Sequence, residues 1–76
     1  MYRLRNLRED NDLTQTDIAK ILNCSQVTYS RYESQSREIP IETLILLAKY
    51  YKTSIDYIVG LTDIKIPYPK ETKNNK

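Results

Sequence analysis

Apolar residues recur at helical spacing along most of this chain, and no segment keeps the strict alternation of a half-buried strand. The pattern predicts a first helix over residues 2–9, where Leu4 and Leu7 lie one turn apart. Asn11 and Asp12 are expected to end it, because both residue types are common in turns and tolerate a positive φ. The hydrophobic pattern therefore indicates an all-α domain.

Hydroxyl side chains mark the starts of the next two helices. Thr14, with Asp17 three residues later, has the pattern of a capping box and predicts a second helix over residues 15–22. Ser25 can cap a third helix over residues 26–34, and Asn23 before it can take the left-handed conformation. The side chains expected to face inward on these two helices are Ile18, Ala19, Leu22, Tyr29 and Tyr32.

Two more helices are expected after a polar loop. Pro40 is placed in the first turn of a fourth helix that ends near Tyr51, and Thr53 or Ser54 caps a short fifth helix that Gly60 terminates. The buried stripe of the fourth helix is predicted to be Ile41, Leu44, Leu47, Ala48 and Tyr51. Because the helical pattern fails from about residue 61, we expect a domain at residues 1–62 and an extended, mobile basic tail at 63–76.

Composition excludes several classes of function. The chain of 76 residues has one cysteine, one glycine and no histidine, so no Ser-His or Cys-His pair, glycine-rich phosphate loop or ordinary zinc site can be built. We therefore expect no enzyme activity, no metal and no cofactor. The apolar runs are too short to cross a bilayer, which favours a cytoplasmic protein without a membrane partner. No small-molecule ligand is evident.

The net charge of +2 does not by itself indicate a nucleic-acid partner, but the placement of the charges is informative. Arginines crowd the first helix and flank the middle of the chain, and lysines fill the predicted tail. These basic residues are Arg3, Arg5, Arg8, Arg31, Arg37, Lys65, Lys70, Lys73 and Lys76.

Residues 15–34 satisfy the requirements of a helix-turn-helix. Two helices that cross steeply after a three-residue turn need a small residue at the crossing, and Ala19 is small. Asn23 suits the positive φ after the second helix, and Cys24 suits the apolar position in the turn, as core rather than as a redox sensor. Together with the inward apolar residues, these features predict a helix-turn-helix motif.

The same residues resemble the helix-turn-helix of the Cro and phage-repressor type, the Xre family. The resemblance covers about residues 4–60, including LTQTDIAKIL, SRYES, IETLILLAKYY and SIDYIVG. It implies a compact five-helix bundle, prokaryotic or phage-borne, with the third helix in the major groove of double-stranded DNA. The chain departs from the family at Asn23 and Gln35, where glycine is usual; Gln35 at a positive φ should cost about 1 kcal/mol.

The resemblance and the chemistry of the side chains give the same candidate DNA contacts. Glutamine can pair with adenine, arginine with guanine, and a valine or threonine methyl with the thymine methyl. The candidate base contacts are Gln26, Val27, Thr28 and Arg31. The candidate phosphate contacts are Arg3, Arg5, Thr14, Gln15, Ser25, Ser30, Ser36 and Arg37. The residues expected to support the motif are Ala19 and Asn23, with Arg8 and Glu33 as the pair that the family uses to link the first and third helices.

Leu46 and Tyr50 lie one turn apart on the fourth helix, outside its predicted buried stripe. We expect them to form a two-fold homodimer interface with Tyr57 and Ile64, so that two recognition helices contact a palindromic operator. The sequence thus favours a transcriptional regulator, most simply a repressor. An antitoxin, or a protein-interaction module on the same helical scaffold, remains an alternative.

Overall fold

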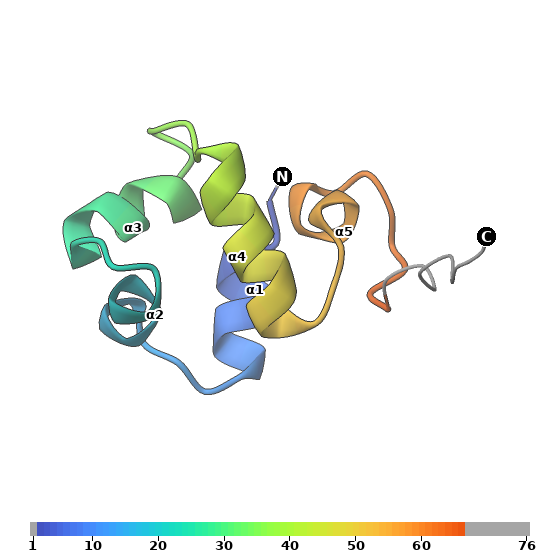
Figure 1. The fold of residues 1–76 in the computed structure, drawn as a ribbon, viewed down its shortest axis with the longest axis horizontal. Coiled ribbons are helices and arrows are strands. Elements are labelled where there is room, and N and C mark those ends of the chain that lie inside the picture. The colour runs from blue at the N-terminus through green and yellow to red at the C-terminus, as the bar shows by residue number, and fades with distance from the viewer. Residues whose placement is uncertain (1, 67–76) are drawn as a thin grey trace.

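The computed structural model describes residues 2–66, and within that range the helices are connected by turns and loops, with no strand. Its five helices are α1 (Leu4–Asp10), α2 (Gln15–Ile21), α3 (Gln26–Glu33), α4 (Ile41–Tyr51) and α5 (Ile55–Val59). Figure 1 shows α2 and α3 at one end of the long axis and α5 at the other, with α1 and α4 between them. The predicted all-α, five-helix architecture is confirmed. The predicted tail beyond residue 66 lies outside the described residues.

The first helix begins two residues later than the hydrophobic pattern predicts. The backbone N–H of Arg3 donates to the carbonyl of Ile58 at 2.7 Å, and that of Tyr2 donates to the side chain of Gln35 at 3.4 Å. These long-range bonds hold residues 2 and 3 against α5 and the loop after α3. The start of the chain therefore leaves the helical path before Leu4.

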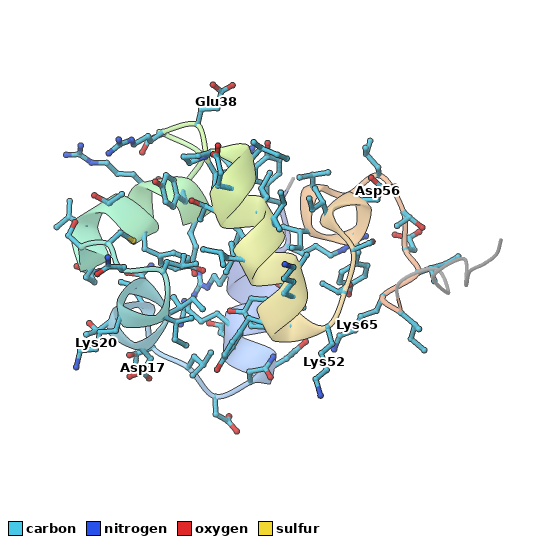
Figure 2. The ribbon with its side chains drawn as sticks, in the orientation of Figure 1. Asp17, Lys20, Glu38, Lys52, Asp56 and Lys65 are labelled. Carbon is cyan, nitrogen blue, oxygen red and sulfur yellow. The ribbon has the colours of Figure 1, made fainter. Side chains whose placement is uncertain are left out.

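Side-chain caps start three of the helices. Thr14 Oγ1 accepts from the backbone N–H of Asp17 at 3.1 Å while the Asp17 carboxylate accepts from the N–H of Thr14 at 2.9 Å, which confirms the capping box. Ser25 caps α3 as predicted. Ser54, and not Thr53, caps α5. Figure 2 shows Asp17 and Lys20 pointing outward from α2.

Thr53 has a different role from the cap that the sequence allowed. Its side chain is buried, and its hydroxyl donates to the backbone carbonyl of Lys65. Figure 2 shows Lys65 and Lys52 near the C-terminal end of α4. The chain after α5 is thereby attached to the turn between α4 and α5.

The start of α4 differs from the prediction. Pro40 is the N-cap, with a ψ of 149° and its carbonyl accepting from Thr43 and Leu44, so the helix begins at Ile41. Ile41, predicted to be buried, is 55% exposed, whereas Ile39 before the cap is buried with Leu44. Ile39 and Leu44 occupy the two positions of a hydrophobic staple, which explains why Ile39 takes the core position.

Between residues 2 and 66, four residues other than glycine adopt a positive φ: Asp12, Asn23, Gln35 and Lys52. The first three were expected at turns on sequence grounds. Lys52 was not; it ends α4 in the left-handed conformation with a φ of 56°. Each such residue costs about 1 kcal/mol relative to glycine, because its Cβ crowds the following carbonyl.

We therefore expect Gln35→Gly to be more stable than Gln35→Ala by about 1 kcal/mol. Both substitutions remove the same side-chain contacts, and only glycine relieves the φ of 60° at this position. Urea unfolding followed by circular dichroism measures the difference. Equal stability of the two variants would show that the loop relaxes to avoid the strained conformation.

The core joins all five helices. It contains Leu4 and Leu7, which lie one turn apart on α1, and the predicted inward residues of the second and third helices pack in or against it. The buried apolar residues are Leu4, Leu7, Ile18, Ala19, Tyr29, Tyr32, Ile39, Leu44, Leu47, Tyr51 and Ile58. This core fixes α2 and α3 against the rest of the domain.

Candidate nucleic-acid interface

The turn between α2 and α3 is built as its sequence predicts. Asn23 follows α2 with a φ of 57°, and the N–H of Cys24 then donates to the carbonyl of Ala19 at 2.9 Å. Ala19 is buried at the contact between the two helices, and the half-buried Cys24 packs against the core. Burial raises the pKa of the Cys24 thiol, which disfavours the reactive thiolate. Ala19, Asn23 and Cys24 therefore support the turn.

Helix α3 has one buried and one exposed face. Tyr29 and Tyr32 point into the core, whereas Gln26, Val27 and Arg31 are exposed. Thr28 and Ser30 are half-exposed between these two sets. The four predicted base-contacting residues thus lie at the surface, and α3 is at one end of the molecule rather than covered by another helix (Figure 1).

A chain of side-chain hydrogen bonds runs from the start of α3 to α1. Gln26 Nε2 donates to Gln15 Oε1 at 2.6 Å, and Gln15 Nε2 donates to Glu33 Oε1 at 3.2 Å. Glu33 is paired with Arg8, whose Nε lies 2.6 Å from Glu33 Oε2 and whose Nη2 lies 3.3 Å from Oε1. Arg8 also donates to the carbonyl of Leu13 at 2.9 Å. We call Gln26, Gln15, Glu33 and Arg8 the anchor network.

The anchor network is largely shielded from water at its inner end. The side chains of Arg8 and Glu33 are only 12% and 7% exposed. The hydrogen bond to Glu33 raises the pKa of Arg8. Burial alone would raise the pKa of Glu33, but the hydrogen bonds from Arg8 and Gln15 outweigh it and the pKa is lowered. Glu33 is therefore an ionised carboxylate that holds α1, α2 and α3 together.

This shift predicts a loss of stability in acid. The lowered pKa means that the folded chain keeps Glu33 ionised below pH 4.5, where the unfolded chain takes up a proton, so stability is full above that pH and falls below it. We expect the wild type to lose more free energy of unfolding than Glu33→Gln between about pH 6 and about pH 3. Urea unfolding at the two pH values measures this difference, with Glu42→Gln on the outside of α4 as the control. A wild type and Glu33→Gln with the same pH dependence would contradict the assignment.

Comparison with known proteins agrees with this geometry. The family model described as Helix-turn-helix matches residues 4–58. The chain belongs to the helix-turn-helix family. This match and the relatives that follow confirm the resemblance to the Xre type.

Three relatives illustrate the range of proteins that share this helix-turn-helix domain. The chain is 40% identical over 73 residues to the HTH-type transcriptional regulator YobD of Bacillus subtilis (strain 168), covering 96% of this chain and 63% of YobD. It is 30% identical over 71 residues to the cryptic phage CTXphi transcriptional repressor RstR of Vibrio cholerae, covering 93% of this chain and 64% of RstR. It is 32% identical over 57 residues to the antitoxin PezA of Streptococcus pneumoniae, covering 75% of this chain and 36% of PezA.

The chain spans less than two thirds of the length of each of these three relatives. No solved structure gives a significant match.

In this helix-turn-helix protein, three of the predicted phosphate contacts come together beside α3. Arg5 of α1, Gln15 of α2 and Ser30 of α3 line one hollow with Glu33 and Ser34. Arg5 is exposed and forms an ion pair with Glu9 at 3.1 Å. Such an exposed pair is weak, so Arg5 can exchange Glu9 for a phosphate.

The other predicted phosphate contacts differ in whether the protein already engages their side chains. Arg37 and Ser36 are exposed in the loop after α3, and within residues 2–66 no ion pair engages Arg31 or Arg37. The hydroxyls of Thr14 and Ser25 accept the backbone N–H bonds that cap α2 and α3. Their first role is therefore to cap these helices.

Arg3 makes contacts within the protein that the sequence did not predict. Its guanidinium donates to the carbonyls of Tyr57 and Thr62 at 2.6 and 2.7 Å, and it pairs with Asp63 at 2.6 Å. It also lies 4.3 Å from the centre of the Tyr57 ring. These contacts satisfy Arg3 within the protein, so we omit it from the proposed phosphate contacts. Sequence reasoning missed this because every partner is more than fifty residues away.

The predicted dimer residues fall into two groups. Leu46, Tyr50 and Ile64 are exposed, but Tyr57 is half-buried, packed against the core and covered by Arg3. Tyr57 therefore supports the fold of this protein rather than an outer surface. Two further apolar residues of α4, Ile41 and Ile45, are exposed beside Leu46 and Tyr50.

Within residues 2–66 no group of three or more His, Cys, Asp or Glu side chains could hold a metal ion. No helix in that range is long and apolar enough to cross a membrane.

Proposed function

We propose that this protein is a sequence-specific DNA-binding transcriptional regulator, a non-enzymatic repressor that acts on the bacterial nucleoid in the cytoplasm and places α3 in the major groove. The observation that carries the proposal is the outer face of α3, which presents Gln26 and Arg31 to solvent while the anchor network holds the helix from behind. The family match and the names of the regulator and phage-repressor relatives support it.

The exposed face of α3 suits the edges of bases. Gln26 keeps its Oε1 and one N–H free after donating to Gln15, and these are the two groups that pair with adenine N6 and N7. Arg31, one turn and a half further along, can donate two hydrogen bonds to guanine O6 and N7. We therefore propose that Gln26 and Arg31 supply the polar base contacts.

The hollow between α1, α2 and α3 suits a phosphate of the DNA backbone. Arg5 supplies a charge, and Gln15 and Ser30 supply hydrogen-bonding groups on the same side of the molecule. Arg37 and Ser36 can reach a second phosphate beyond the end of α3, and Thr14 can donate its hydroxyl hydrogen. The hydroxyl of Ser25 donates to Thr28 Oγ1 at 2.9 Å, so it has to turn away from Thr28 to reach a phosphate. These contacts fix the position of α3 without selecting a sequence.

The experiment is a titration of the full chain against selected and random duplexes at two salt concentrations. The proposal expects affinity to fall with salt by a log–log slope of about −0.9 for each phosphate contact, with a clear preference for selected sequences. A protein-interaction module would show neither property. Binding that is insensitive to both salt and sequence would refute the proposal.

We also propose that the protein binds a palindromic operator as a two-fold homodimer through α4. Ile41, Ile45, Leu46 and Tyr50 form an exposed apolar face, with 40–55% of each side chain accessible. A second copy of the chain is the occupant that the function favours, because it places two recognition helices about 34 Å apart, one turn of DNA.

Leu46→Glu is expected to convert the dimer into a monomer, because the charge would be buried at the interface. Sedimentation velocity measures the change. The control is Ile21→Glu, which adds the same charge at an exposed apolar position of α2 and should leave the dimer intact. A wild type that sediments as a monomer at high micromolar concentration would contradict the dimer.

The similarity to the antitoxin PezA supports a second candidate, an antitoxin that binds DNA through the same α3 face and a toxin elsewhere. DNA binding does not separate the two candidates. Co-expression with the protein encoded by the adjacent gene separates them. If that protein inhibits growth and co-expression of this chain restores growth, the antitoxin is favoured.

A further inference from the structure

Gln35 follows α3 in a backbone conformation that glutamine does not favour. Its φ is 60°, and the backbone N–H groups of Ser36 and Arg37 then donate to the carbonyl of Arg31 at 3.0 and 3.3 Å. Glycine adopts this left-handed conformation without a steric cost, whereas the Cβ of glutamine crowds the following carbonyl. Gln35 therefore lowers the stability of the domain unless its side chain makes a compensating contact.

The side chain of Gln35 makes such a contact with the start of the chain. Its Oε1 accepts the backbone N–H of Tyr2 at 3.4 Å, across 33 positions of the sequence. Residues 2 and 3 are themselves fixed, because the Tyr2 side chain packs against the core and the backbone N–H of Arg3 donates to the carbonyl of Ile58 at 2.7 Å. Gln35 therefore attaches the loop after α3 to the body of the domain.

The loop that Gln35 attaches carries two of the proposed phosphate contacts, Ser36 and Arg37. Arg37 lines one hollow with Tyr2, Gln35 and Glu38, so the contact between Gln35 and Tyr2 lies beside the Arg37 side chain. Within residues 2–66 no ion pair holds the guanidinium of Arg37. The position of Arg37 therefore depends on the backbone of the loop.

A loop that is held before binding supports a stronger contact than a mobile one. A mobile loop loses conformational freedom when it binds, and this loss is subtracted from the free energy of binding. Resting on the proposed DNA-binding function, we propose that Gln35 is a positioning residue, whose hydrogen bond to Tyr2 holds Arg37 in place for a phosphate. Gln35 acts through Arg37 rather than by touching DNA.

The first test removes the Gln35 amide in two ways. Gln35→Gly and Gln35→Ala both lack the acceptor for Tyr2, and only glycine relieves the φ. Each variant should bind selected and random duplexes about threefold more weakly than the wild type, near the lower end for one hydrogen bond because 3.4 Å is long. If Gln35 only stabilised the fold, both folded variants would bind as tightly as the wild type, and that result overturns the proposal.

The second test removes the donor instead of the acceptor. Tyr2→Pro lacks the backbone N–H that Gln35 accepts, whereas Tyr2→Ala keeps it, and both lose the tyrosine ring. Tyr2→Pro should bind about threefold more weakly than Tyr2→Ala, and the difference should vanish when each is combined with Gln35→Ala. Equal binding by the two single variants contradicts the assignment. Circular dichroism confirms that every variant is folded.

Arg37 decides whether the effect passes through the proposed phosphate contact. In an Arg37→Ala background, the further substitution Gln35→Gly should leave the affinity unchanged, because the side chain that it positions is gone. A loss as large as in the wild-type background overturns the positioning role.

The wild type separates this inference from the proposed function. Salt-dependent and sequence-dependent binding that the Gln35 substitutions do not change overturns the positioning role alone and leaves the DNA-binding function intact. A wild type that prefers no sequence, with binding insensitive to salt, refutes the proposed function itself.

Discussion

Glu33→Ala is expected to lower the free energy of unfolding by about 3 kcal/mol, because it leaves the Arg8 guanidinium without its partner in a poorly solvated position. The two side chains are 12% and 7% exposed and share two hydrogen bonds, so water can replace little of what the carboxylate supplies. This value is at the lower end of the loss expected when one partner of a buried ion pair is removed, because Arg8 keeps its hydrogen bond to the carbonyl of Leu13. Urea unfolding of the two proteins measures it.

The exposed pair between Arg5 and Glu9 provides the control for this experiment. Its side chains are 72% and 53% exposed, so Glu9→Ala should cost less than about 1 kcal/mol. A double variant, Arg8→Met with Glu33→Leu, should be more stable than Glu33→Ala alone because it leaves no unpaired charge. If Glu33→Ala were no more destabilising than Glu9→Ala, the anchor network would not be a stabilising feature.

Arg31→Ala is expected to weaken binding to a selected duplex by about 1–3 kcal/mol, and binding to a random duplex by much less. The reason is that an arginine that pairs with guanine contributes to one sequence, whereas a phosphate contact contributes to all sequences. Because Arg31 is exposed on α3, its removal should leave the stability of the domain unchanged. Equilibrium binding to both duplexes measures the two losses.

Arg37→Ala is the matched control, since Arg37 is also exposed and lies in the loop directly after α3. It should weaken binding to both duplexes about equally and reduce the salt slope by about one contact. An equal loss on every duplex for Arg31→Ala would move Arg31 from the base contacts to the phosphate contacts.

Most of the fold could be predicted from the sequence because its signals are local. The capping box of Thr14 and Asp17, the cap at Ser25, and the left-handed Asn23 each depend on residues within four positions of one another. Helical spacing of the apolar residues then identified the inward faces of α2 and α3. Gly60 ends α5 with a φ of 88°, as a glycine after a helix predicts.

The predictions from the sequence are wrong where the sequence allows two local structures and tertiary packing determines which one forms. Thr53 and Ser54 are equally good caps by type, and the contact of Thr53 with Lys65 decides between them. Ile39 replaces Ile41 in the core because the helix begins one residue later than the proline suggested. Nothing in the type of residue 52, a lysine, predicts a left-handed conformation. Lys52 adopts it because the chain has to turn toward α5 at the end of α4.

The candidate site shows the same division. The exposure of Gln26, Val27 and Arg31 follows from the periodicity of α3 and was predictable. The pairing of Arg8 with Glu33 was implied by resemblance to the family, and the structure shows it. The engagement of Arg3 by residues on and after α5 had no signal in the sequence, because no spacing rule links positions so far apart.

Because of the anchor network, the exposed positions of α3 differ in whether a substitution there also affects the stability of the domain. Gln26 belongs to the network that stabilises the domain, so a substitution there changes both base preference and packing. Val27 and Arg31 make no such side-chain contacts within the described residues, and substitutions there leave the scaffold untouched. Under the proposed DNA-binding function, descendants of this protein can therefore acquire new operators through positions 27 and 31 without first evolving a more stable fold.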